Sequence, residues 1–483
     1  MEINPAIKFM HDRKVMFAKR PKVLIVGAGL GGLTLGAILQ KSDIPYEIFE
    51  RAPEVKPLGS AITLNATMAP FLHQMGLMEE FLSVSKLVPS IQFANEDRQV
   101  HLTMTGGFDG AKEKYGGETR VIPRPVFYDL MMRQVPRERI HLGKKILTTK
   151  QGGNGILVRC SDGTEHEGDI LVGADGAHSA VRQNLYAQLK KDHRLPASDD
   201  VPLPFSTVSL VGQTKPLSKE EFPHVELRES QFIRILGHNR PYALATLTTA
   251  QRSVTWSLTQ FLDSESSKEN DSFRNSEWGP EAASAMCDQV RDFPVIAGGN
   301  KELTLGDLID WTPKECISKV MLEEKIFQTW HDCRTVLMGD ACHKLSPSGG
   351  VGATNAMHDA IVLANYINAL PFHPVVDEIE RALASYRAER IECVERAFET
   401  SQTLKKMVAK GVVPMIIRFV IKNMPESMAR RRLDQLYSSR PQVSFLPFYE
   451  TGALVKAGPQ PSLSAKTPIP EQQDGEEAFA QTV

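Results

Sequence analysis

Short apolar runs alternate with a helix-type pattern in the N-terminal part of the chain. Residues 22–26 (KVLIV) form a largely apolar run that ends in glycine, as buried parallel strands do, and residues 46–50 (YEIFE) form a second run of this kind. Between them, residues 33–40 have the pattern of a packed helix. A strand–helix–strand unit of about 30 residues predicts a parallel, doubly wound α/β sheet.

The pattern changes further along the chain, and these changes define the expected domains. Residues 200–262 hold β-rich runs separated by polar turns, which predicts a substrate-binding sheet inserted into a Rossmann-like, nucleotide-binding domain. That domain is expected in two parts, at 21–199 and 326–400. A mainly helical connection is expected at 263–325, between the sheet and the second part.

Both ends of the chain are expected to lie outside these domains. Residues 1–20 resemble a loosely ordered leader, and residues 441–483 an extended, proline-rich tail. The segment 401–440 carries nine lysines and arginines against two acids, and it is expected to form a basic, C-terminal helical region. It has two interpretations: a solvated helical face that covers the core, or a contact with an anionic membrane surface.

Composition restricts the class of protein. With 42% hydrophobic residues, 24% charged residues and a net charge of −2, the chain has an ordinary globular composition, and no nucleic-acid partner is expected. The six cysteines include no C-x-x-C pair, so neither a metal site nor a disulfide framework is expected. No apolar run reaches the roughly 18 residues of a membrane-spanning helix. A cytoplasmic location is therefore expected, with or without peripheral attachment to a membrane.

The first chemical signal follows the first expected strand. Gly27, Gly29 and Gly32 form a G-x-G-x-x-G motif between that strand and the helix. The first glycine permits a tight turn, the second lets the backbone approach a pyrophosphate, and the third lets helix and strand pack closely. Glu50, at the end of the second strand, can bind both ribose hydroxyls and would repel a ribose 2′-phosphate. The nucleotide at this site is therefore expected to be FAD or NAD rather than NADP.

Two further blocks place an acid directly after an expected strand. Asp175 lies in the sequence DILVGADGAHSAVR, which ends at Arg182, and Asp340 lies in the sequence VLMGDACHKLSPSGGVGA. The loop after Asp340 leads into a helix expected at about 352–370, whose N-terminal end would stabilise negative charge on a ligand. Asp359 on that helix is expected to be structural. The candidate cofactor-binding residues of the loop are Gly350, Gly352 and Ala353.

Together these blocks resemble three motifs of the group A FAD-dependent monooxygenases, the para-hydroxybenzoate hydroxylase-like family, and in particular its fungal members that oxidise secondary metabolites. The resemblance covers residues from about 20 to 400. It implies that Asp340 contacts the ribityl chain of FAD and that Gly350 to Ala353 lie under the pyrimidine end of the flavin. It also implies that Asp175 supports the binding of FAD and of the nicotinamide cofactor.

The resemblance implies a reaction as well. NADPH or NADH and dioxygen would be used to hydroxylate or epoxidise an apolar aromatic or unsaturated metabolite, such as a polyketide or terpenoid. An arginine is expected near the FAD phosphates, with Arg124 as the candidate and Arg120 as the competitor. A flavin-dependent halogenase is the alternative enzyme, disfavoured because the W-x-W-x-I-P element is absent. A non-catalytic module of the GDP-dissociation-inhibitor type is disfavoured by the intact phosphate loop.

Arg182 and Tyr242 are the candidate catalytic residues. The substrate wall is expected to come from the inserted sheet, where Tyr242, Arg234 and His238 could polarise a phenol or a carbonyl. Arg182 either faces the cleft or forms a structural salt bridge. Trp256 is expected to pack in the core rather than to line a pocket.

Overall fold

A computed structural model of the 483-residue chain gives the positions of most residues. The described residues are 19–54, 61–237, 240–262, 280–408, 416–417, 419–421 and 423–465. His238, nearly all of the expected leader and the end of the expected tail lie outside the described residues.

A six-stranded sheet with the order β21-β22-β12-β1-β2-β8 lies at the centre of the nucleotide-binding part, and only the edge strand β21 is antiparallel. Every residue of the central strands β1 and β12 is buried, because structure covers both faces of the sheet. This arrangement confirms the expected doubly wound α/β fold. The strands are β1 (Val23–Val26), β2 (Tyr46–Phe49), β8 (Ile140–His141), β12 (Ile170–Gly173), β21 (His331–Asp332) and β22 (Thr335–Leu337).

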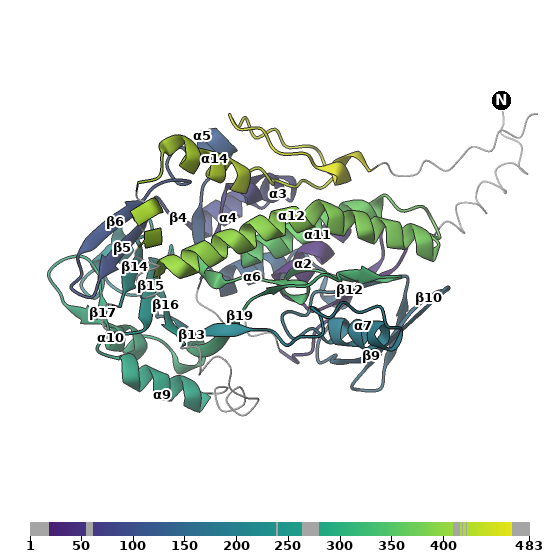
Figure 1. The fold of residues 1–483 in the computed structure, drawn as a ribbon, viewed down its shortest axis with the longest axis horizontal. Helices are drawn as coiled ribbons and strands as arrows, with labels where there is room; N and C mark the ends of the chain where they lie inside the picture. The colour runs from purple at the N-terminus through teal and green to yellow at the C-terminus, as the bar shows by residue number, and fades with distance from the viewer. Residues whose placement is uncertain are drawn as a thin grey trace, which may run out of the picture.

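Five helices position the expected site around this sheet. They are α2 (Leu30–Leu39), α6 (Arg124–Met132), α7 (Ala180–Lys191), α11 (Gly352–Asn368) and α12 (Val376–Val408). In Figure 1, α12 runs from the inserted sheet across to the right side of the molecule, with α11 and α2 beside it and α7 beyond β12. The helix expected at about 352–370 is thereby confirmed.

Smaller elements complete the nucleotide-binding part. The sheet β3-β7-β4 and the antiparallel sheet β11-β10-β9 are each three-stranded. These strands are β3 (Ala61–Leu64), β4 (Lys86–Leu87), β7 (Arg120–Pro123), β9 (Ile146–Gly152), β10 (Gly155–Cys160) and β11 (Glu165–Gly168). The short helices are α3 (Ala69–Gln74), α4 (Met78–Val84), α5 (Ala111–Tyr115) and α14 (Glu426–Leu436).

The inserted sheet is larger than residues 200–262. Its seven strands have the order β19-β13-β16-β15-β14-β5-β6, so three separate parts of the chain contribute to it. They are β5 (Ile91–Asn95), β6 (Val100–Met104), β13 (Phe205–Gln213), β14 (Phe232–Leu236), β15 (Tyr242–Thr248), β16 (Val254–Phe261) and β19 (Ser318–Glu323). The connection expected to be mainly helical thus also supplies the edge strand β19, besides α9 (Pro280–Val290) and α10 (Leu305–Asp310).

The two faces of this sheet have different neighbours. On one face, Leu244 and Trp256 belong to an apolar cluster with residues of α9 and α10, seen at the lower left of Figure 1. On the other face, Phe93, Leu236 and Ala243 pack with Met407 of α12. The second face is therefore the one turned toward the nucleotide-binding part.

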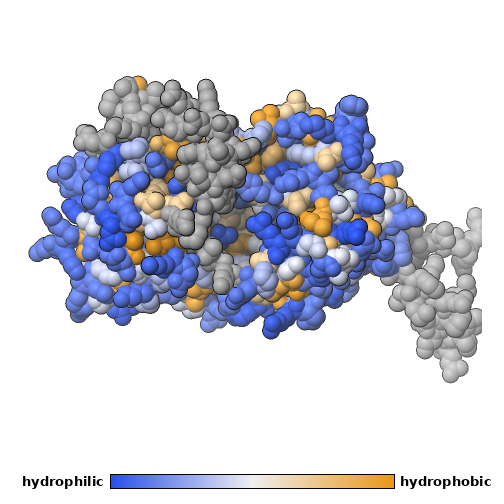
Figure 2. Space-filling model, turned by 90° about the horizontal axis from the view of Figure 1, so that it is seen from below, coloured by the Kyte–Doolittle hydropathy of each residue, from blue (hydrophilic) through white to orange (hydrophobic). Residues whose placement is uncertain are grey.

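The C-terminal segment from 441 to 465 is bound closely to the helices. The side-chain amide of Asn365 donates to the carbonyl of Gln442 (2.8 Å), and the N–H of Ser462 donates to Glu389 (2.8 Å). Among the described helices, none combines the length and the apolar character needed to cross a bilayer. On the face seen in Figure 2, hydrophilic side chains surround separate apolar patches.

Candidate flavin site

The phosphate loop gives each of its three glycines a different environment. Gly27 has φ +105°, and a Cβ added there would lie 2.4 Å from the carbonyl oxygen of Ala174. A Cβ on Gly32 would lie 2.0 Å from the carbonyl oxygen of Gly27, so only glycine fits between helix and strand. A Cβ on Gly29, at the N-cap of α2, would meet no protein atom within 4 Å. The loop is thus closed at Gly27 and Gly32 and open at Gly29, as a pyrophosphate site requires.

Glu50 lies beside this opening at the end of β2. Its carboxylate accepts hydrogen bonds from the N–H groups of Ala28 (3.0 Å) and Ala52 (2.9 Å). A carboxylate has about four acceptor positions, so two remain for ribose hydroxyls. The carboxylate therefore also fixes the phosphate loop, a role that was not expected from the sequence.

Tyr128 and Arg124 complete the same region from α6. The hydroxyl of Tyr128 donates to the carbonyl of Ala28 (2.8 Å), and burial together with Glu50 raises the pKa of this phenol above its usual range. Arg124 is the exposed first residue of α6 and lies close enough to Tyr128 to oppose that shift. Sequence reasoning missed Tyr128, although its i,i+4 spacing from Arg124 places both on one helix face.

Arg120, the competing arginine, is occupied elsewhere. Its guanidinium donates to the hydroxyl of Ser85 (2.8 Å), to the carbonyl of Ser85 (3.0 Å) and to Glu118 (3.2 Å). The geometry therefore favours Arg124 as the arginine near the phosphates.

Asp175 caps α7. Its Oδ2 accepts hydrogen bonds from the N–H groups of Ala180 (2.6 Å) and Val181 (3.2 Å), whereas its buried Oδ1 has no protein partner among the described residues. Burial raises the pKa of this carboxyl, and the hydrogen bonds oppose the shift. An acceptor without a partner at this position fits a ligand hydroxyl.

Arg182 binds backbone rather than a carboxylate. It donates to the carbonyls of Ala341 (2.7 Å) and Ala177, and its guanidinium stacks on Phe327 at 4.3 Å. The side chain therefore ties the Asp175 block to the Asp340 block. This placement corresponds to the structural alternative, although through carbonyls instead of the expected salt bridge.

The Asp340 block turns sharply before it enters α11. Asp340 pairs with Lys344, and Gly350 adopts φ +64°, where an added Cβ would lie 2.8 Å from the hydroxyl of Thr63. α11 then begins at Gly352, where an added Cβ would meet no protein atom within 4 Å. The first turn of α11, which contains Ala353, has no acidic residue. Its positive end is therefore available to an anionic or electron-rich group.

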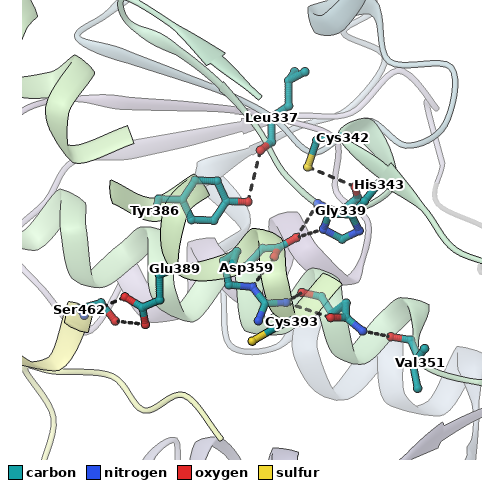
Figure 3. A network of polar contacts seen from close by, with 12 residues as sticks. Leu337, Gly339, Cys342, His343, Val351, Asp359, Tyr386, Glu389, Cys393 and Ser462 are labelled. Carbon is teal, nitrogen blue, oxygen red and sulfur yellow. Dashed lines mark hydrogen bonds and ion pairs between the residues drawn. The ribbon is translucent and has the colours of Figure 1, made fainter. Parts of the chain in front are cut away.

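A buried polar network holds this block in place (Figure 3). Asp359 accepts hydrogen bonds from the N–H of Gly339 (2.8 Å), from His343 (2.6 Å) and from Arg390 (2.7 Å). Burial alone would raise the pKa of Asp359, but His343 and Arg390 outweigh it and hold the pKa below its usual range. The structural role expected for Asp359 agrees with this geometry. Arg390 was missed, because the sequence does not show which helix packs on α11.

Cys342, His343 and Asp359 lie within 4.8 Å of one another, a spacing that could accommodate a metal ion. The carboxylate, however, already accepts three hydrogen bonds, one of them from the cation Arg390. Burial also raises the pKa of the Cys342 thiol well above its usual value, which disfavours the thiolate that a metal would bind. The cluster is therefore a structural network.

Tyr242 does not face the nucleotide-binding part. Along β15 it shares a face with Leu244, and its ring packs edge-to-face against Phe293 at 6.4 Å, on the side covered by α9 and α10. This position corrects the expectation that Tyr242 contacts the substrate. Trp256 is buried on the same side and donates to the hydroxyl of Thr312 (3.0 Å), as expected for a core residue.

Arg234 lies on the opposite face, toward the Asp340 block. Its Nη2 donates to the carbonyl of Ser348 (2.9 Å), just before α11. Of the polar residues proposed for the substrate wall, it is the described one that reaches the expected flavin loop.

Three features together define a dinucleotide site of the flavin type. They are the open space at Gly29 before α2, the unpartnered oxygen of Asp175 and the first turn of α11, which has no acid. A family model described as an FAD binding domain matches residues 20–292 and 300–401. The chain therefore belongs to this family, within the para-hydroxybenzoate hydroxylase-like FAD-dependent monooxygenases, and FAD is its cofactor.

Similar proteins agree with this assignment. The FAD-dependent monooxygenase andE of Emericella variicolor is 27% identical over 421 residues, covering 82% of this chain and 83% of that protein. The FAD-dependent monooxygenase ptmM of Penicillium ochrochloron is 27% identical over 398 residues, covering 80% of this chain and 89% of that protein. The structure of Klebsiella pneumoniae HpxO with FAD and uric acid superimposes with a TM-score of 0.64 at 17% identity, covering 86% of this chain and 96% of that chain.

Proposed function

We propose that this protein uses NADPH or NADH to insert one oxygen atom of dioxygen into an apolar aromatic or unsaturated metabolite, by hydroxylation or epoxidation. The observation that carries the proposal is the contact between α2 and α11. A Cβ on Gly31 would lie 3.3 Å from the Cβ of Ala356, so the start of the phosphate loop helix lies against the first turns of α11. One bound FAD would thus meet both helix N-termini.

The chain's own residues have separate tasks in this proposal. Gly27, Gly29 and Gly32, with Glu50 and Arg124, would hold the adenosine diphosphate part of FAD. Asp175 and Asp340 would bind hydroxyls of its central chain, and Gly350, Gly352 and Ala353 would lie against the ring. When bound, FAD supplies the redox chemistry with the nicotinamide and with dioxygen. The inner face of the seven-stranded sheet, which is largely apolar, would support the substrate and exclude water.

Relatives such as andE and ptmM are FAD-dependent monooxygenases from fungi, which supports the class of enzyme. Within that class, we propose that a polyketide or terpenoid is the metabolite that is oxidised. The test is product mass analysis after incubation of the purified protein with such metabolites, dioxygen and either reductant. A product heavier by one oxygen atom supports the proposal. A halogenated product in the presence of halide would instead support the halogenase, and a purified protein without flavin absorbance would support the non-catalytic module.

A cavity of about 450 Å³ beside α7 is the proposed entry of the reductant. The cations Arg182 and Lys190 line its wall together with the acids Asp199, Asp200 and Glu323. Lys190 pairs with Asp200 (2.5 Å), and Arg182 connects the cavity to the Asp340 block. Lys190→Glu should therefore raise the KM for NADPH or NADH with little effect on kcat. Lys191→Glu is the control, because Lys191 is exposed on the same helix and does not line the cavity. Equal KM values in the two variants would remove the cavity from the proposal.

We also propose that the segment 401–440 contacts an anionic membrane surface. Ile416, Phe419 and Val420 are 54%, 68% and 52% exposed, and the arginines at 430, 431 and 432 are exposed nearby in sequence. Exposed apolar side chains next to cations suit an anionic membrane surface. Co-flotation with vesicles that contain phosphatidylserine, and its loss in Phe419→Glu, would support the contact. Equal recovery with pure phosphatidylcholine vesicles would favour the solvated helical face.

A further inference from the structure

A small polar cavity of about 30 Å³ lies between α11, α12, α14 and the turn at residues 65–67. A bound water needs about 10–15 Å³, so this cavity has room for about two oxygen-sized atoms. Thr354 and His358 of α11 line it, and both side chains are only 4% exposed. The hydroxyl of Thr354 and the Nε2 of His358 have no hydrogen-bond partner among the described residues. Two buried polar groups without partners point to a small polar occupant.

Cys393 of α12 lines the same cavity, and Figure 3 shows it at the edge of the Asp359 network. Its sulfur accepts a hydrogen bond from the Nη2 of Arg396 (3.3 Å), which also pairs with the exposed Glu392. Burial would lower the pKa of Arg390, but Asp359 and then Cys393 raise it above its usual value. Cys393 is thus close to two cations. Such surroundings favour the thiolate, which is the nucleophilic form of a cysteine.

The other five cysteines have surroundings that oppose the thiolate. Burial raises the pKa of each of these thiols, and a nearby acid raises it further. Two of them, Cys316 and Cys333, are half-buried, as Cys393 is, so they serve as internal controls of similar exposure. The guanidinium of Arg396 and the cavity set Cys393 apart from these two controls.

We infer that Cys393 is a site of reversible oxidation by hydrogen peroxide, which converts the thiol to a sulfenic acid whose oxygen lies in the cavity. The sulfur attacks one peroxide oxygen, so an S–O bond forms while the O–O bond breaks. Sulfur loses two electrons to the peroxide, and the second oxygen takes up the thiol proton and leaves as water. Thr354 and His358 can hydrogen-bond the new oxygen, and a thiol reductant restores the cysteine. No step requires the flavin, so this site is independent of the proposed function.

The size of the cavity should determine which oxidant reacts. Its volume suits the two oxygen atoms of hydrogen peroxide but leaves no room for the four carbon atoms of tert-butyl hydroperoxide. Cys393 should therefore be oxidised ahead of the two control cysteines by hydrogen peroxide and not by the bulkier peroxide.

The test is differential alkylation of the full-length, FAD-loaded protein. After timed exposure to either peroxide, free thiols are blocked in denaturant with light iodoacetamide. Reversibly oxidised thiols are then reduced with dithiothreitol and labelled with heavy iodoacetamide, and peptide mass spectrometry gives the oxidised fraction of each cysteine. With hydrogen peroxide, Cys393 should react about tenfold or more faster than Cys316 and Cys333.

Variants of two arginines on α12 test the role of the cation. Arg396→Gln should slow the oxidation of Cys393 about threefold or more, because it removes the charge beside the sulfur. Arg381→Gln is the matched control, because Arg381 is exposed on the same helix and does not line the cavity. Its rate of oxidation should equal that of the wild type.

Four outcomes would overturn the inference. They are equal rates at Cys393 and the two control cysteines, an unchanged rate in Arg396→Gln, oxidation that dithiothreitol does not reverse, and the same preference for Cys393 with tert-butyl hydroperoxide. If Arg396→Gln does not fold, the wild-type rates with the two peroxides decide. Product analysis with a substrate is a separate measurement, so loss of this site leaves the proposed function standing.

Discussion

At the scale of single residues, two glycines of the phosphate loop are required for different reasons: one by the packing of the protein itself, the other by the space that the ligand needs. Gly32 has no space for a side chain, whereas Gly29 has space and ordinary backbone angles of φ −73° and ψ 178°. Gly32→Ala should therefore destabilise the fold by about 1–3 kcal/mol through overpacking.

Gly29→Val should leave the apoprotein as stable as the wild type and abolish FAD binding, because its side chain would occupy the pyrophosphate position. Urea unfolding and flavin absorbance measure the two effects. Full flavin content in Gly29→Val would contradict this placement of the loop.

Asp359 provides a second prediction at this scale, because it compensates a fully buried arginine. Asp359→Asn keeps the shape of the side chain but replaces one acceptor oxygen with an NH2 donor and leaves Arg390 without a counter-charge. It should therefore cost about 3–5 kcal/mol of unfolding free energy. Replacing both residues, with Asn at 359 and Met at 390, should cost less than the sum of the single changes. Urea unfolding of the four proteins gives the coupling free energy. Additive single changes would show that the two side chains do not stabilise each other.

At the scale of elements, the N-terminus of α11 is predicted to control the charge of the ring. Ala353→Asp would place a carboxylate in a first turn that has none, which favours the helix itself but opposes negative charge on a ligand. Anaerobic bleaching of the flavin by NADPH or NADH should therefore slow about threefold or more. The melting temperature of the apoprotein should stay the same or rise. Unchanged bleaching in the FAD-loaded variant would show that this helix does not face the flavin.

The elements also show what the sequence could predict. The strand–helix–strand unit and the helix after Gly352 follow from local patterns, since glycine and apolar spacing act over a few residues. The strands β5 and β19 could not be assigned to the inserted sheet, because their partners β14 and β13 lie far away in sequence. β6 joins the sheet only through its pairing with β5. The prediction that Tyr242 faces the substrate was wrong for a related reason. Side chains alternate along a strand, so a shift of one residue in register changes the face of the sheet on which each side chain lies.

At the scale of the whole molecule, buried His358 makes stability depend on pH. Burial is the larger cause and the charge of Arg390 the smaller one that lowers the pKa of His358 to about 3. A histidine in the unfolded chain has a pKa of about 6.5. Between these values the unfolded state binds the extra proton, so the free energy of unfolding falls as pH decreases from about 6.5. One such group contributes up to about 1.4 kcal/mol per pH unit. Urea unfolding between pH 6.5 and 5, above the range where Asp359 titrates, should show a smaller slope in His358→Gln. Identical slopes would mean that other groups dominate.

The seven-stranded sheet also limits how the gene can be divided. β14 pairs in parallel with β5, and the edge strand β19 pairs with β13, so the sheet is complete only when residues 91 to 323 have all been synthesised. Neither the nucleotide-binding part nor the inserted sheet is therefore one continuous segment that can be expressed alone. Neither can be exchanged with the same part of a relative at a single crossover point. A chimaera that changes substrate preference has to take all three segments of the sheet from the same relative. The alternative is to substitute side chains on the inner face of the sheet and to keep all seven strands of this protein.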